Sequence, residues 1–68
     1  MENRIKELRQ QFDFTQQDLG DKVSVSRQTI ISLENGKYNP SITLAYKIAK
    51  TFDLFIEEVF LFEEEKLV

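Results

Sequence analysis

The stretch from Thr15 to Asn35, TQQDLGDKVSVSRQTIISLEN, predicts two short helices joined by a turn. Thr15 suits the N-cap of the first helix, because Asp18 three residues later completes a capping box. We therefore expect the first helix to begin at Gln16 and to stop near Lys22.

The second helix of this stretch has start and stop signals of its own. Ser26 is a suitable N-cap, and the helix that it opens is expected to run to Asn35. Gly36 follows, and glycine is the residue type favoured where a helix ends in a left-handed conformation. Two helices joined by about four residues form a helix-turn-helix, here spanning residues 16–35.

The two faces of the second helix differ in kind. Its turn of about 100° per residue places Thr29, Ile30 and Leu33 on one side, which predicts a core face. The other side carries groups that can hydrogen-bond base edges in a major groove, and an isoleucine suited to a thymine methyl. These residues are Arg27, Gln28, Ile31, Ser32 and Asn35. The alternative is that they are ordinary solvated side chains on a surface helix.

The run TQQDLGDKVSVSRQTIISLENGKYNPS, residues 15–41, resembles the helix-turn-helix of the Cro and C1 repressor family of bacterial and phage regulators. The similarity extends over residues 1 to about 60 and includes the SRQTI core, the LENGK close of the recognition helix and the downstream NPS. The resemblance implies an all-α fold, a compact five-helix bundle of the lambda-repressor-like DNA-binding type.

Candidate contacts to double-stranded DNA follow from this resemblance together with the chemistry of the outward face. Base contacts in the major groove are expected from Gln17, Arg27, Gln28, Ile31 and Ser32. Contacts to the DNA backbone are expected from Gln16, Ser26, Asn35, Lys37 and Tyr38. In the resembled family, the residues that match Arg9 and Glu34 form a structural ion pair; the alternative for this chain is two free surface charges.

The sequence departs from the family pattern at four positions. Asp13, Ser24 and Asp53 stand where the family usually has glycine, at positions that normally need a positive φ. Asp tolerates such a conformation better than Ser, for which we expect a cost of roughly 1–2 kcal/mol. Gly20 replaces the usual alanine, and glycine inside a helix costs about 1 kcal/mol relative to alanine. We expect the same fold at lower stability.

Length and composition limit the possible functions. A chain of 68 residues is expected to form one domain, residues 1–68. It contains neither Cys nor His, so we expect no disulfide, no metal site and no cofactor, and the commonest catalytic base and thiol nucleophile are missing. Without these catalytic groups we expect a protein that is not an enzyme. No secretion signal or membrane-spanning run is present, from which we expect a cytoplasmic protein.

Charge is unevenly distributed along the chain. Residues 1–50 carry eight Lys or Arg and six Asp or Glu, a net charge of +2, whereas residues 51–68 carry one and six, a net charge of −5. The total of −3 is unfavourable for DNA binding, but the excess of acid lies in the C-terminal part. Residues 1–50, which contain the predicted helix-turn-helix, are therefore mildly basic.

The C-terminal segment, residues 55–68, is expected to form a dimer interface. It begins with a short helix and continues into an apolar run that either closes the core or meets another chain. The interface candidates are Phe55, Phe60, Leu61 and Phe62. Some short members of the resembled family have a short C-terminal strand, which here would begin at Leu61.

The function expected from these features is sequence-specific DNA binding by a transcriptional regulator. A repressor that binds a partly palindromic operator as a homodimer fits best, because one recognition helix reads few base pairs. The alternative is an antitoxin or a protein-binding adaptor built on the same fold.

Overall fold

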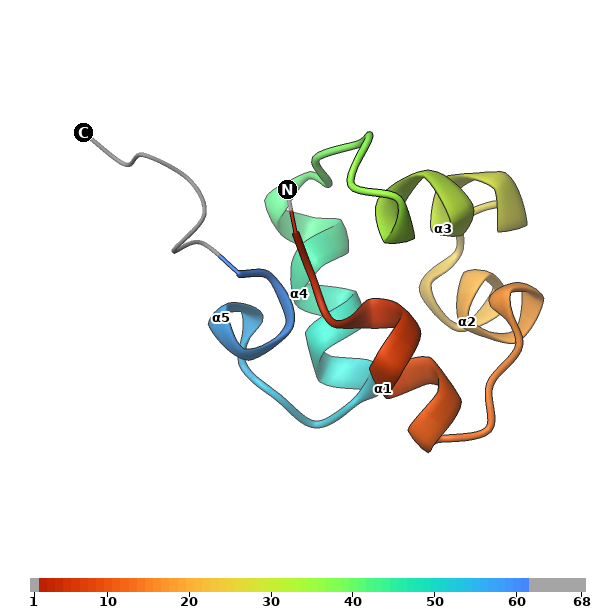
Figure 1. The fold of residues 1–68 in the computed structure, drawn as a ribbon, viewed down its shortest axis with the longest axis horizontal. Helices are drawn as coiled ribbons and strands as arrows, with labels where there is room; N and C mark the ends of the chain where they lie inside the picture. Colours follow the sequence, from red (N-terminus) through yellow and green to blue (C-terminus); the bar gives the residue numbers. More distant parts are fainter. Residues whose placement is uncertain (1, 62–68) are drawn as a thin grey trace.

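The computed structural model describes residues 2–61, which form five short α-helices and no β-strand (Figure 1). The helices are α1 (Ile5–Gln11), α2 (Gln16–Val23), α3 (Arg27–Glu34), α4 (Ile42–Thr51) and α5 (Ile56–Val59). In Figure 1, α2 and α3 lie at one end of the longest axis and α5 lies toward the other end. The all-α, lambda-repressor-like five-helix fold is confirmed.

Side-chain caps fix the starts of α2, α3 and α4. Thr15 Oγ1 accepts a hydrogen bond from the Asp18 N–H at 3.0 Å, and the Asp18 carboxylate accepts one from the Thr15 N–H at 2.9 Å. This is the predicted capping box. The Ser26 hydroxyl accepts from the Thr29 N–H and the Ser41 hydroxyl from the Leu44 N–H, which caps α3 and α4 without a reciprocal bond. The predicted N-cap of α3 is thus confirmed.

The capping box also lowers the pKa of the Asp18 carboxyl below its usual value. The main cause is the backbone hydrogen bond from Thr15, which stabilises the charged form. The Thr15 hydroxyl and the positive charge of Lys22 act in the same direction, against a small opposing effect of desolvation.

Three residues other than glycine adopt the left-handed conformation, as the family pattern predicts. Their φ angles are 57° for Asp13, 62° for Ser24 and 58° for Asp53. Gly36, with a φ of 73°, follows the end of α3 as expected. The chain thus keeps the turns of the fold without glycine at three of them.

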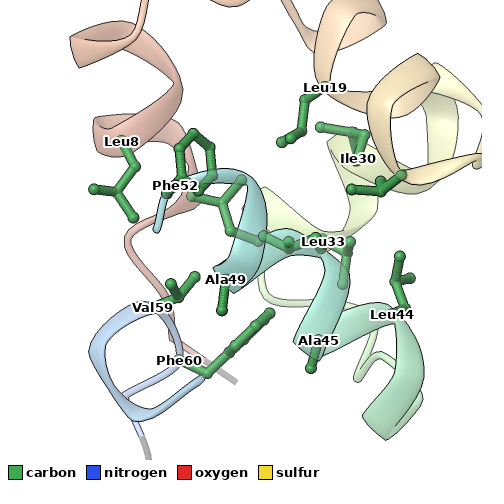
Figure 2. Close-up of a cluster of buried hydrophobic side chains, with 13 residues drawn as sticks. Leu8, Leu19, Ile30, Leu33, Leu44, Ala45, Ala49, Phe52, Val59 and Phe60 are labelled. Atoms are coloured by element: carbon green, nitrogen blue, oxygen red, sulfur yellow. The ribbon is translucent and has the colours of Figure 1, made fainter. Parts of the chain in front are cut away.

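All five helices contribute to one hydrophobic core, and Figure 2 shows most of its side chains around α4. Side chains from α1, α2 and α3 cover one side of α4, and residues at the end of α5 cover the other. The buried residues are Ile5, Leu8, Leu19, Val23, Ile30, Leu33, Leu44, Ala45, Ile48, Ala49, Phe52, Val59 and Phe60. Phe60 is the largest of the fully buried side chains.

The two ends of the described chain pair with each other. Asn3 and Phe60 form an isolated antiparallel bridge, flanked by hydrogen bonds from the Arg4 N–H to Val59 O at 2.8 Å and from the Leu61 N–H to Glu2 O at 2.9 Å. Because Asn3 takes part in this bridge, α1 begins only at Ile5.

The bridge changes the interpretation of the C-terminal segment. Phe60 is 1% exposed and belongs to the monomer core, so it has almost no surface left for a second chain. Leu61 is half-buried, and Phe55 is exposed. Phe62 and the strand expected from Leu61 onward lie outside the described residues. Within residues 2–61, Phe55 is the interface candidate with most surface available.

Candidate nucleic-acid interface

The α2–turn–α3 unit is held by apolar side chains on its inner face. Leu19 and Val23 of α2 and Ile30 and Leu33 of α3 are buried in the common core. Thr29, predicted to share this inner face, is half-buried. The opposite face of α3 is left toward solvent.

Arg27 and Gln28, at the start of α3, are exposed, and neither side chain has a hydrogen-bonding partner within residues 2–61. Their donor and acceptor groups are thus available to a ligand. Ser26, just before them, uses its hydroxyl to accept a hydrogen bond from the Thr29 N–H at 3.2 Å. That hydroxyl also lies 3.1 Å from Thr29 Oγ1.

A shallow hollow on one flank of α3 collects five of the predicted contact residues. Its volume is about 310 Å³, and it lies between α3 and the loop that follows. The lining residues are Ser26, Gln28, Thr29, Ser32, Lys37 and Tyr38. Thr29 alone among them was not predicted to contact DNA. One ammonium group, one amide and several hydroxyls converge here.

A second hollow, of about 590 Å³, brings together the other predicted residues at the helix N-termini. Gln16, Gln17 and Arg27 all line it, although Arg27 comes from a different helix. Two hydrogen-bonding surfaces therefore adjoin the start of α3.

Arg9 and Glu34 form an ion pair that ties α1 to α3. The distance from Arg9 Nε to Glu34 Oε2 is 2.8 Å, and the side chains are 13% and 6% exposed. Arg9 Nη1 also donates to Phe14 O at 3.0 Å. The pair is thus part of the architecture that sets the position of α3.

Both glutamines at the start of α2 already have a partner within the chain. Gln16 Nε2 donates to Glu34 Oε1 at 3.2 Å, and Gln17 Nε2 donates to Asp21 Oδ1 at 2.9 Å. The Gln17–Asp21 spacing of four residues on a helix could have predicted the second bond. Each amide keeps one N–H and its carbonyl oxygen for a ligand.

Ile31 and Asn35 line neither hollow. Ile31 is half-buried, so less of its surface faces outward than the helix pattern predicts. Asn35 is exposed and forms the C-cap of α3, and its backbone N–H donates to Ile31 O at 3.0 Å.

Asn3 links the start of the chain to α3, a role that was not predicted from the sequence. Its side-chain Nδ2 donates to Leu33 O at 2.8 Å, near the end of α3, and its Oδ1 accepts from the Ile5 N–H at 3.0 Å. The segment before α1 therefore helps to anchor the end of α3.

Residues 2–61 contain no cluster of three or more His, Cys, Asp or Glu side chains that could hold a metal ion. None of the five helices is both long and apolar enough to cross a membrane.

Comparison with known proteins gives consistent matches over nearly the whole chain. Residues 5–59 match the family model described as helix-turn-helix. An uncharacterized HTH-type transcriptional regulator of Archaeoglobus fulgidus is 55% identical over 67 residues, which cover 98% of this chain and 94% of the relative. Antitoxin HipB of Escherichia coli O6:H1 is 36% identical over 52 residues, covering 76% of this chain and 55% of the antitoxin.

The fold is also that of a solved structure. A chain of the SinR protein/SinI protein complex superposes with a TM-score of 0.78 and 26% identity, covering 96% of this chain and 64% of that chain. The family match, the relative aligned over 94% of its length and the superposition all indicate the same helix-turn-helix fold. The chain belongs to the Cro/C1-type helix-turn-helix family of transcriptional regulators.

Proposed function

We propose that this protein is a sequence-specific DNA-binding repressor that places α3 in the major groove of a partly palindromic operator. The main support for this proposal is that Arg27 and Gln28 are adjacent and exposed, and that neither side chain has a hydrogen-bonding partner within residues 2–61. A guanidinium can donate two hydrogen bonds to guanine O6 and N7, and a glutamine amide can pair with adenine N6 and N7.

We propose further contacts from the side chains around α3. Lys37 and Tyr38 would meet a phosphate and Gln28 and Ser32 the bases, and the support for this is that all four line the first hollow. Gln16, Ser26 and Asn35 complete the proposed backbone contacts. Gln17 and the outward part of Ile31 complete the proposed base contacts.

Homodimer formation is part of the same proposal. One recognition helix reads too few base pairs for selective binding, and dimers of this kind place two half-sites about 34–36 Å apart. The position of α5, away from α2 and α3 in Figure 1, supports a contact between copies that leaves both recognition helices free. We infer a cytoplasmic location from the same proposal, because the proposed DNA target would lie there.

Selection of bound sequences from random double-stranded DNA tests the proposal. We expect a short motif repeated with two-fold symmetry and a spacing of about one helical turn, bound with a strong dependence on salt. A pool that shows no enriched motif would contradict sequence-specific binding. An enriched motif without symmetry would contradict the dimer alone.

An antitoxin is the second candidate, and the similarity to HipB is the observation that favours it. An antitoxin of this fold would bind a protein partner as well as DNA. Co-expression with the product of a neighbouring gene, followed by growth measurement, distinguishes the two: relief of toxicity by this chain indicates an antitoxin.

A further inference from the structure

A third hollow shares no lining residue with the two hollows beside α3. It is shallow, has a volume of about 390 Å³ and lies where the end of α2 and the turn after it meet α4. The lining residues are Lys22, Ser24, Tyr46, Lys47, Lys50 and Thr51. Three of the six are lysines and none is acidic, so it is called the basic hollow below.

The three ammonium groups of the basic hollow are not neutralised by ion pairs. Each of these lysines is exposed, and none forms an ion pair with a carboxylate of residues 2–61. The chain as a whole carries nine Lys or Arg and twelve Asp or Glu. Three unpaired lysines around one hollow are therefore a local excess of positive charge on an acidic protein.

The lysines come from two separate helices. Lys47 and Lys50 are three residues apart on α4 and are therefore neighbours on its surface. Lys22 comes from α2, and its Nζ lies 4.8 Å from the centre of the Phe14 ring, a cation–π contact that restricts the side chain. Asp18, which interacts electrostatically with Lys22, does not line the hollow.

Ser24 adds a hydroxyl to the basic hollow from a costly backbone conformation. Its φ is 62°, at the position where the family pattern has glycine. The Ser24 side chain forms no hydrogen bond within residues 2–61, so its hydroxyl is available as a donor. Residues held in unfavourable backbone conformations cluster at binding sites. By contrast, the Thr51 hydroxyl already donates to Lys47 O at 2.8 Å.

We propose that the basic hollow binds a small molecule that carries a diphosphate group, held by the ammonium groups of Lys22, Lys47 and Lys50 and by the hydroxyl of Ser24. Lysine binds phosphate as a point charge, and three such charges match the roughly two or three negative charges of a diphosphate near neutral pH. The volume of the hollow falls within the range of about 300–1,000 Å³ that is usual for small-molecule sites.

The site goes beyond the proposed DNA-binding function and does not depend on it, because the two use different residues. The net charge of −3 opposes a general attraction of anions to this protein. Binding of a diphosphate therefore requires a local group of cations such as this one.

Titration of the ¹⁵N-labelled, full 68-residue chain with inorganic pyrophosphate tests the proposal. We expect backbone amide shifts concentrated in residues 22–24 and 46–51, with a dissociation constant below about 1 mM in a low-salt buffer. Inorganic monophosphate should bind at least about threefold more weakly, because it carries less charge. Sodium chloride at the same ionic strength should not reproduce the pattern.

Lys47→Ala and Lys50→Ala should each weaken pyrophosphate binding at least about threefold, as expected for the loss of one exposed charge contact. Lys6→Ala is the matched control, because Lys6 is an exposed α1 residue outside the hollow and its loss changes the net charge equally. It should leave the dissociation constant unchanged. Circular dichroism verifies that each variant is folded.

Ser24→Gly separates binding from stability. It should weaken pyrophosphate binding by removing a donor, although glycine relieves the backbone strain and stabilises the fold. A purely structural Ser24 would leave the affinity unchanged, which would contradict its assigned role.

Three outcomes would overturn the site as a whole. They are amide shifts spread evenly over the surface, a response to chloride equal to that to pyrophosphate, and an unchanged affinity in both Lys47→Ala and Lys50→Ala. Shifts at the hollow with duplex DNA of random sequence but none with pyrophosphate would assign it to a nucleic-acid backbone and also overturn the proposal. A failure to select any DNA sequence, with pyrophosphate binding intact, would disprove the DNA-binding function and leave this site standing.

Discussion

The carbonyl oxygen of Val25 lies 2.7 Å from the position that a Cβ atom would occupy on Gly20. The same turn is closed by a hydrogen bond from the Val25 N–H to Gly20 O at 2.9 Å. The family pattern favours alanine at this position, and by helix propensity alone the glycine would lower the stability of α2. In this chain the close approach of the turn requires it.

Gly20→Ala should therefore lower the free energy of unfolding rather than raise it. The substitution gains about 1 kcal/mol of helix propensity, but it forces a backbone carbonyl to move, and such overpacking costs about 1–3 kcal/mol. We expect a net loss of about 1 kcal/mol by chemical denaturation. Gln11→Ala, at an exposed helical position, should be nearly neutral, and a more stable Gly20→Ala protein would contradict this account.

Ser24→Gly should stabilise the protein. Ser24 has a φ of 62°, a conformation that costs a residue with a Cβ about 1–2 kcal/mol but that glycine adopts freely. Part of the gain is offset by the greater freedom of glycine in the unfolded chain. The net increase should be about 0.5–1 kcal/mol, measured by urea unfolding, and should exceed that of Asp53→Gly.

Arg9→Ala should lower the free energy of unfolding by about 3 kcal/mol, because it leaves the carboxylate of Glu34 partly buried without its main partner. Glu7→Ala is the matched control. It removes the Arg4–Glu7 pair, whose side chains are 37% and 56% exposed, and exposed pairs contribute less than about 1 kcal/mol. If both variants lost a similar free energy of unfolding, the burial of Glu34 would not explain the contribution of the Arg9–Glu34 pair to stability.

Asp18→Asn should destabilise the protein near neutral pH but not in strong acid. The pKa of Asp18 is lowered in the folded state, so its charge stabilises the fold above the usual Asp pKa of about 3.9. That stabilisation is lost as the pH falls through the lowered pKa of the folded protein. Melting temperatures of both proteins measured across this range should converge in acid, and a constant difference would argue against a role for the charge.

Arg27→Ala and Lys37→Ala should weaken operator binding in different ways. Loss of a bidentate guanine contact should reduce discrimination at one base pair by about 1–3 kcal/mol. Loss of a phosphate contact should weaken binding to all sequences alike and lower the salt slope by about one unit. Binding titrations at several salt concentrations, on operator and on mismatched duplexes, measure both effects. A change of base preference in Lys37→Ala alone would reverse the assigned roles.

Features decided within one or two turns of chain were predictable from the sequence. A capping box needs residues three apart, so Thr15 and Asp18 identified the start of α2 without knowledge of the fold. The positive φ of Ser24 followed from the family pattern.

Features that depend on distant segments were not predictable. The burial of Phe60 depends on its bridge to Asn3, and the need for Gly20 depends on where the turn directs the carbonyl of Val25. In the candidate interface, the sequence identified the outward side of α3 but not the bond from Gln16 to Glu34, which joins two different helices. The sequence of an apolar run such as Val59 to Leu61 does not show whether the run packs in the monomer core or contacts another chain.

The bridge between Asn3 and Phe60 has a consequence for synthesis on the ribosome. Ile5 and Leu8 are made early, whereas Val59 and Phe60, which belong to the same core, are the last core residues to be added. At about 5–20 residues per second, the ribosome needs roughly 3–10 s to reach Phe60 after Ile5. Until Phe60 has been added, the side chains of α1 lack part of their packing, so the core can be completed only after residue 60 has been made.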